Sequence, residues 1–367
     1  MNQNIQDLGA HLDRRQALYQ TLGLLPSAFR GRTVLEVGPG SGHNSLFVAS
    51  VEPARYVLVE GNPKGGEDIG KLYDGQSITH VRPEVIASKL EDFASPSRFD
   101  VVLCEGWLGS SLHERAMLSK LATFVADEGV LVVTVLSPTG MLLNTIRKTL
   151  CLRLVGPAEP LERRLEISLA AFSPHLATLA SMTRSHRDWL LDMVLSPAYF
   201  DICLTPQQAV EALPTDFEFY GSSPRFSQDW RWYKGLSGSG RRVSEAFLQS
   251  YVENIPNFLD YRTLVSGRTA EQNRVLDAAG LALLQASAAW ERTWRSRAAP
   301  PDVVAAMAAA LAASGGLSTT ITAGLTEARD LLISDEIGPA DVASMAVFGE
   351  LFGRELIYVA FHRHRST

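Results

Sequence analysis

The chain has 367 residues, of which 46% are hydrophobic, and its formal net charge at pH 7 is −6. This length allows two domains or one fold with a large insertion, and the apolar content supports substantial cores. The negative charge argues against a nucleic-acid partner. The sequence has no apolar run of about 18 residues and no signal-peptide pattern at its start, so it predicts a cytoplasmic protein without a membrane partner.

An amphipathic helix is predicted within residues 1–30. Apolar residues recur near helical spacing from Ile5 to Leu25, and Pro26 closes the pattern. The helix ends shortly before a short apolar run, Thr33–Val37, whose length and β-branched residues are typical of a buried parallel strand.

Glycines follow that strand at every second position, at Gly38, Gly40 and Gly42. Glycine tolerates a positive φ and lets the backbone approach a ligand, and a helix opening at His43 would direct its N–H groups toward that ligand. A dinucleotide fingerprint would need its third glycine at position 43. The alternating spacing, with Glu36 two residues ahead of the first glycine, therefore predicts a different nucleotide ligand.

Further strand-like segments follow in order. Tyr56–Glu60 is a strand that ends in an acid, a third strand is predicted near Ile78–Ala87, and Lys89–Phe93 is the turn after it. Phe99–Cys104 and Gly129–Val135 are the fourth and fifth strands. Together with the glycine loop, these segments resemble the class I S-adenosylmethionine (SAM)-dependent methyltransferases.

This resemblance implies an α/β fold, a doubly wound seven-stranded mostly parallel sheet, with SAM as cofactor and S-adenosylhomocysteine (SAH) as product. Glu60 would accept hydrogen bonds from both ribose hydroxyls, and Asp92, with Glu91 beside it, would hold the adenine amino group. Tyr19 would either cover the methionine end of SAM or be merely half-buried. The expected cofactor-binding residues are Glu36, Gly38, Pro39, Gly40, Gly42, His43, Glu60, Gly61, Asn62, Glu91, Asp92, Cys104 and Glu105.

The acceptor is expected beyond the fourth strand, because ligands of open α/β sheets gather at the carboxyl ends of strands. Glu105 is a candidate contact to the substrate or the cofactor amine, His113 a candidate base, and Trp107 a ring on which a substrate can stack. An ordinary structural contact is the alternative for each. The prolines typical of methyltransferases that act on nucleobase or glutamine amino groups are missing here, which argues against that chemistry.

The resemblance implies a helical lid over residues 140–200. His186 in this segment is a candidate proton acceptor, because imidazole titrates near neutral pH, and Asp188 and Trp189 are candidate substrate contacts. The alternative is that Ser185 and Asp188 simply cap a helix.

The remaining boundaries complete a four-part organisation. Residues 1–30 form the N-terminal helix, and 31–234 the SAM-binding core with its lid and a sixth strand at Asp216–Tyr220. Residues 235–353 form a helical insertion, with a possible homodimer surface, after a glycine-rich linker. Residues 354–367 hold a last apolar strand, which needs a sheet, and a solvated tail. The family's sheet places an antiparallel seventh strand between strands five and six.

These features lead to one functional hypothesis and two rivals. The first is a metal-independent methyltransferase that acts on an O or N atom of a small molecule, such as a secondary metabolite or saccharide. No metal is predicted, because the cysteines are scattered and Leu136–Gly140 lacks the acidic pair of the magnesium-dependent catechol-type enzymes. The rivals are a catalytically silent SAM-binding partner or regulatory protein, and a methyltransferase for a carrier-bound or protein substrate.

Overall fold

The computed structural model describes residues 7–75, 81–108, 113–180, 182–196, 203–235 and 241–365. The chain divides into two compact units, each built from segments that are distant in the sequence. Unit 1 comprises Met1–Val135, Leu204–Tyr251 and Leu356–Thr367, and unit 2 comprises Leu136–Cys203 and Val252–Glu355. The segment predicted as a lid and most of the segment predicted as an insertion therefore lie in the same unit.

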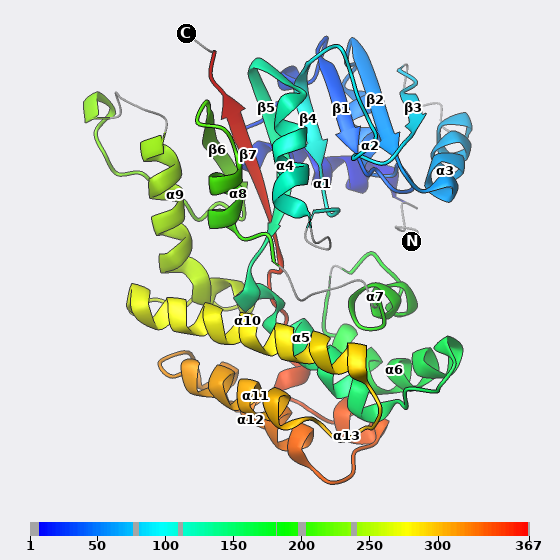
Figure 1. The fold of residues 1–367 in the computed structure, drawn as a ribbon, viewed down its shortest axis with the longest axis vertical. Helices are drawn as coiled ribbons and strands as arrows, with labels where there is room; N and C mark the ends of the chain where they lie inside the picture. Colours follow the sequence, from blue (N-terminus) through cyan, green and yellow to red (C-terminus); the bar gives the residue numbers. More distant parts are fainter. Residues whose placement is uncertain are drawn as a thin grey trace. The chain divides into compact units, whose positions relative to one another are not determined.

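Unit 1 contains a seven-stranded sheet with the order β3-β2-β1-β4-β5-β7-β6 (Figure 1). The strands β1 to β5 pair in parallel, whereas β6 and β7 pair antiparallel. The predicted mostly parallel sheet is thus confirmed, and the last strand of the chain lies between β5 and β6. The strands are β1 (Thr33–Val37), β2 (Arg55–Glu60), β3 (Glu84–Ala87), β4 (Phe99–Cys104), β5 (Val125–Leu136), β6 (Phe217–Ser223) and β7 (Leu356–Arg363).

The helices of unit 1 pack on this sheet through apolar side chains. Tyr19, Phe29 and Phe47 form an aromatic cluster, with ring centroids 4.9 Å apart for Tyr19 and Phe29 and 5.3 Å apart for Tyr19 and Phe47. The helices are α1 (Leu8–Thr21), α2 (Ser45–Ser50), α3 (Pro63–Asp74), α4 (Glu114–Thr123), α8 (Pro206–Ala212) and the first part of α9 (Arg241–Asn254).

Several element boundaries differ from the sequence predictions. Strand β3 begins only at Glu84, because Pro83 just before it has no N–H to donate to a ladder. Residues 78–80 of the predicted third strand lie outside the described part of the chain. The helix after the glycines begins at Ser45 instead of His43. Strand β7 continues to Arg363, so His362 and Arg363 belong to the sheet instead of to a solvated tail, and Arg363 donates to Asp216 at 2.8 Å.

Unit 2 is helical, and its central helix is α5 (Pro138–Leu154), in which every residue is buried. The Arg147 side chain is completely buried there; its Nη2 donates to the Leu351 carbonyl at 2.8 Å and its guanidinium lies 3.9 Å from the Phe352 ring centroid. Burial lowers the pKa of Arg147 to about 9. The other helices are α6 (Leu161–Leu176), α7 (His186–Met193), α10 (Ala270–Thr293), α11 (Pro301–Ala313), α12 (Thr319–Ile333) and α13 (Pro339–Ala343).

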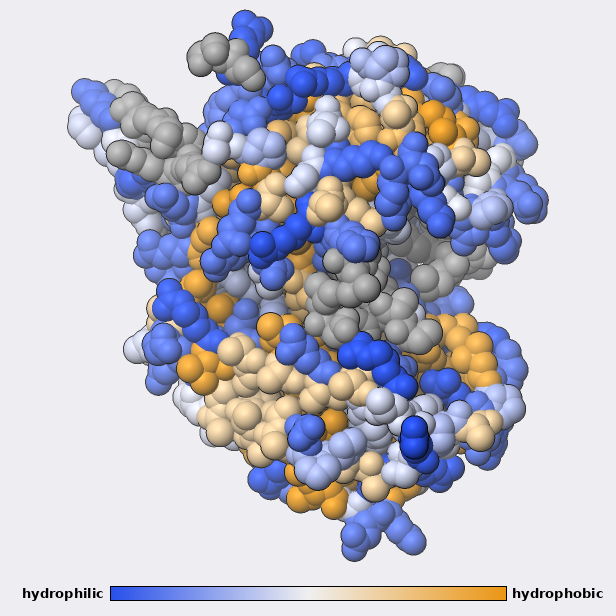
Figure 2. All heavy atoms as spheres, in the orientation of Figure 1, coloured by the Kyte–Doolittle hydropathy of each residue, from blue (hydrophilic) through white to orange (hydrophobic). Residues whose placement is uncertain are grey.

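Helix α13 ends at Ala343, and only a short 3-10 turn at Phe348–Glu350 follows it, so the end of the predicted helical insertion is not one continuous helix. Weakly hydrophobic surface gathers over α10, in the lower half of Figure 2. The homodimer predicted through this helical region stays a prediction. Within the described residues, no helix has the length and hydropathy of a bilayer-spanning segment. The exposed alanines of α10 and α11 are Ala270, Ala278, Ala282, Ala289, Ala305, Ala308, Ala309 and Ala312.

Candidate functional site

The glycine loop after β1 has the backbone conformation that its sequence predicts. Gly38, Gly40 and Gly42 have φ values of 72°, 60° and 77°, in the region that favours glycine. The Gly38 N–H donates to the Val59 carbonyl at 2.9 Å, which fixes the start of the loop beside the end of β2. The loop is therefore held open at the carboxyl edge of the sheet, where ligands of such sheets bind.

The Glu60 carboxylate at the end of β2 organises this loop. Its Oε2 accepts a hydrogen bond from the Gly40 N–H at 2.8 Å, and its Oε1 accepts one from the Asn62 N–H at 2.7 Å. Only 8% of the residue is exposed. A side chain at position 65 would collide with Glu60, since an added Cβ there would lie 2.9 Å from its Cγ. The acid predicted to bind ribose thus also joins the glycine loop to the turn after β2.

An open pocket of about 350 Å³ lies at the carboxyl ends of four neighbouring strands. Gly38, Glu60, Gly61, Asn62 and Glu91 are the predicted cofactor-binding residues that the structure brings together in its wall. The complete lining consists of Val37, Gly38, Val59, Glu60, Gly61, Asn62, Ser88, Lys89, Leu90, Glu91 and Trp107.

Other predicted cofactor residues lie beside this wall or beneath it. Asp92 is exposed next to Glu91, and Cys104 is fully buried, with burial raising the pKa of its thiol. The Nδ1 atom of His43 lies 2.7 Å from the Ser41 hydroxyl, and the His43 carbonyl lies 3.1 Å from His11 Nε2. Pro39 is half-buried in the glycine loop. Burial lowers the pKa of both imidazoles, His11 and His43.

Glu36, the acid ahead of the glycines, is buried in unit 1 with 5% of its surface exposed. The Tyr56 hydroxyl donates a hydrogen bond to its Oε2. Burial and then the nearby charge of Glu105 raise the pKa of Glu36 to about 7, although the bond from Tyr56 acts in the opposite direction. With this pKa, Glu36 changes its protonation state near neutral pH, and it does not line the pocket.

We expect Glu36→Gln to alter the pH dependence of stability. The folded carboxyl has a pKa of about 7 against an ordinary value of 4.5, so the folded state binds more protons between these values. The free energy of unfolding should therefore fall as pH rises through this window, by about 3 kcal/mol from this group. Glutamine does not titrate, so the variant lacks this pH-dependent loss of stability. Its free energy of unfolding, measured by urea unfolding, should therefore rise relative to that of wild type between pH 5 and pH 8. An equal difference between the two proteins at both pH values would contradict this assignment.

A buried ion pair connects α1 to the end of β4. The Arg15 guanidinium donates to Glu105 Oε2 at 2.5 Å, and the Tyr19 hydroxyl donates to Glu105 Oε1 at 2.7 Å. Burial alone would lower the pKa of Arg15, but the charge of Glu105 and the neighbouring Tyr19 raise it above its usual value. Tyr19 is only 1% exposed, so the expectation that it is half-buried is wrong.

Sequence reasoning missed Arg15, although a signal was present. His11, Arg15 and Tyr19 are four residues apart, so they share the buried face of α1. The prediction rested on the apolar residues from Ile5 to Leu25 and assigned no role to the polar residues between them. Polar residues at that regular spacing could have indicated a buried polar face.

The remaining candidate catalytic and substrate residues are divided between the two units. His113 is exposed at the start of α4 in unit 1. His186 begins α7 in unit 2, where the Ser185 hydroxyl donates to Asp188 Oδ2 at 2.8 Å and accepts from the Asp188 N–H at 3.0 Å. This is the capping contact that the sequence offered as the alternative. Trp189 is 9% exposed and packs against Phe352, with ring centroids 6.2 Å apart.

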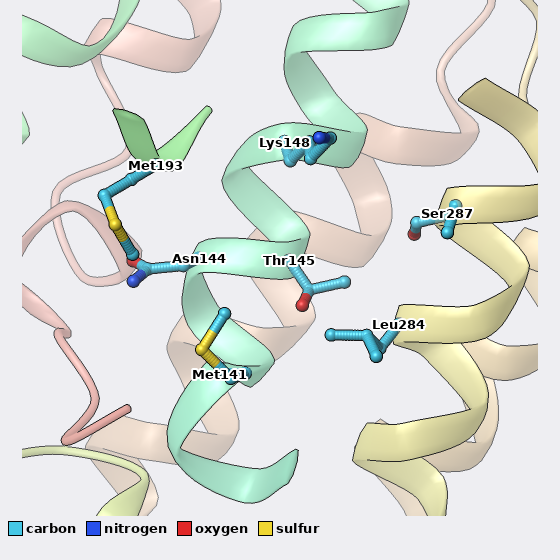
Figure 3. Close-up of a pocket in the computed structure, with 8 residues that line it drawn as sticks. Met141, Asn144, Thr145, Lys148, Met193, Leu284 and Ser287 are labelled. Carbon is cyan, nitrogen blue, oxygen red and sulfur yellow. The ribbon is translucent and has the colours of Figure 1, made fainter. Parts of the chain in front are cut away.

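Unit 2 contains a separate narrow pocket between α5 and α10 (Figure 3). Lys148 in its wall donates to the Ser196 carbonyl at 2.6 Å and pairs with Glu291 at 2.8 Å. Asn144 is 4% exposed and points toward Met193. No three His, Cys, Asp or Glu side chains of the described residues are grouped as metal ligands would be.

Comparison with known proteins matches part of the chain to methyltransferases. A family model described as a methyltransferase domain matches residues 10–177. Two curated relatives from Arabidopsis thaliana are a probable histone-arginine methyltransferase 1.4, 33% identical over 120 residues, and protein arginine N-methyltransferase PRMT10, 31% identical over 93 residues. These matches cover 33% and 25% of this chain, but the chain spans only 21% and 24% of the relatives' lengths.

Similar solved structures include PKMT2 from Rickettsia typhi in complex with AdoHcy, which is 19% identical with a TM-score of 0.41 over 65% of this chain and 50% of that one. The CcbJ methyltransferase from Streptomyces caelestis is 18% identical, with a TM-score of 0.31 over 35% of this chain and 51% of that one. The family match includes the glycine loop, the acid at the end of β2 and the strand order β3-β2-β1-β4 around the pocket. Residues 10–177 therefore match a methyltransferase domain, and this match supports the class I S-adenosylmethionine-dependent methyltransferase family that the sequence resembles.

Proposed function

We propose that this protein is an enzyme that transfers a methyl group from SAM to an acceptor, with the cofactor bound in the pocket at the ends of β1 to β4. SAM is the cofactor of this family. The observation that carries the proposal is the joint placement of the glycine loop, Glu60 and Glu91 in one open pocket. A protein that merely shares the fold would not need these three features at one edge of its sheet.

The residues present fit the cofactor. Each Glu60 oxygen accepts one backbone N–H, which leaves lone pairs for ribose hydroxyls. An added Cβ at Gly40 would meet no atom within 4 Å, so the backbone there stands open to a ligand. Glu91 lies at the β3 end of the same pocket, where its carboxylate can accept a hydrogen bond from the adenine amino group. The sequence assigned this role first to Asp92.

When bound, SAM supplies an already activated methyl group. The protein then has to bind the cofactor, align the acceptor and exclude water, and alignment alone can supply much of the rate. The ion pair of Arg15 and Glu105 joins α1 to the end of β4, and the bond from Tyr56 to Glu36 joins β2 to β1. An acceptor that loses a proton would need a base, for which Glu105, His113 and His186 remain candidates.

We propose a nitrogen of a protein side chain as the acceptor, because the curated relatives are named as protein arginine or histone-arginine methyltransferases. The small-molecule O- or N-acceptor is the second candidate. It is favoured by the ion pair at the end of β4, since Arg15 already neutralises the Glu105 carboxylate that would attract a cationic guanidinium.

Transfer of label tests these proposals. The protein is incubated with SAM carrying a tritiated methyl group and with extract of the native host, and protein and small-molecule fractions are then separated. Label in the protein fraction supports a protein acceptor, and label in the small-molecule fraction supports the second candidate. Tight SAM binding without labelling of either fraction would contradict the enzyme assignment and favour a silent SAM-binding partner. Parallel reactions with the variant Glu60→Ala measure the background labelling.

A further inference from the structure

The cofactor pocket has a regular layout because its walls come from four strand ends. In sheet order, Ser88–Glu91 follow β3, Glu60–Asn62 end β2, Val37 and Gly38 end β1, and Trp107 follows β4. Neighbouring strands lie about 4.8 Å apart. A long ligand that lies across these ends therefore meets the segments one after another.

The proposed cofactor contacts set the direction of such a ligand. Adenine at Glu91 and ribose at Glu60 place the first two groups at the ends of β3 and β2. The sulfonium is joined to the far side of the ribose, so it continues toward the ends of β1 and β4. This step rests on the proposed function.

Trp107 lies at that end of the pocket. An added Cβ on Gly38 would lie 3.1 Å from Trp107 Cγ and 3.3 Å from its Cδ1, so the indole packs directly on the first glycine of the loop. Trp107 is the aromatic side chain among the described lining residues. The Glu105 carboxylate two positions earlier is already bonded to Arg15 and Tyr19.

We propose that the Trp107 indole binds the positive sulfonium of SAM through a cation–π interaction and thereby makes the pocket prefer SAM to its neutral product SAH. Cations over the face of a tryptophan ring are attracted by its negative π surface, and quaternary cations are recognised in this way. Trp107 thus determines cofactor charge specificity, a different role from the acceptor stacking that the sequence indicated.

Calorimetric titration of the full-length protein with SAM and SAH tests this proposal. In Trp107→Leu the ratio of SAM affinity to SAH affinity should fall by about 2- to 30-fold, and Trp107→Phe should give a smaller fall. Sinefungin, which has a protonated amine in place of the sulfonium, should lose affinity as SAM does. Using a ratio removes any effect of the substitution on the glycine loop that weakens both ligands equally.

Trp230→Leu is the matched control, since Trp230 also belongs to unit 1 but is 89% exposed and lies outside the pocket wall. The ratio of SAM affinity to SAH affinity in Trp230→Leu should equal that of wild type. An unchanged ratio in Trp107→Leu, with both ligands still bound, would overturn the role of Trp107 and leave the proposed function standing. If wild-type protein bound neither ligand, the proposed function itself would fail.

Discussion

Glu60→Ala is expected to weaken SAM binding by about 10- to 100-fold, because it removes hydrogen bonds between a buried carboxylate and the ribose hydroxyls. The structure adds a second reason for a large effect. The same carboxylate accepts the Gly40 and Asn62 N–H groups, so its loss also releases the glycine loop and leaves these donors to water. Isothermal titration calorimetry measures the change directly, and a thermal melt shows whether the fold survives.

Two further variants separate these contributions. Glu60→Gln keeps the shape and one acceptor oxygen, so it should bind SAM with an affinity between those of wild type and Glu60→Ala. Glu84→Ala removes a carboxylate from the exposed start of β3, where it pairs with Arg55 at 2.9 Å, and should leave the affinity unchanged. Unaltered SAM affinity in Glu60→Ala would remove the central assignment of the pocket.

The parts of the fold that depend on neighbouring residues were predictable from the sequence. Thr33–Val37, Tyr56–Glu60 and Phe99–Cys104 are short apolar runs whose residues are buried on both faces of a parallel sheet, so composition and length alone indicated them. The alternating glycines likewise indicated a loop with positive φ values, because no other residue type adopts a positive φ as readily.

The features that depend on distant contacts were not predictable in this way. Arg15 and Glu105 are 90 positions apart, and only the packing of α1 against the sheet brings them within hydrogen-bonding distance. Trp107 was assigned to an acceptor because it follows β4, whereas its contact with Gly38 depends on the path of the loop after that strand. The association of residues 136–203 with 252–355 in one unit also depends on tertiary packing that helical periodicity does not encode.

Removal of the last twelve residues is expected to abolish folding of unit 1, although they are only the end of the chain. Strand β7 lies between β5 and β6, and Ile357, Val359 and Ala360 in it are completely buried. A stop after Glu355 would leave β6 without its partner and expose one edge of β5, and unpaired edges of this kind promote aggregation. We expect an insoluble protein, or one without SAM binding, in expression and calorimetry.

A stop after Arg363 is the matched control, because it keeps all of β7 and removes only His364–Thr367. Arg363 would still donate to Asp216 and to the Val125 carbonyl, both at 2.8 Å, and so hold the end of the strand. The lost contacts include the hydrogen bond from the His364 N–H to the Asp216 carbonyl. Water at the surface can donate to that carbonyl instead. This shorter truncation should therefore stay soluble and bind SAM normally. Recovery of a soluble protein with normal SAM affinity after the stop at Glu355 would show that β7 is dispensable. The sheet would then not need the antiparallel pair of β6 and β7.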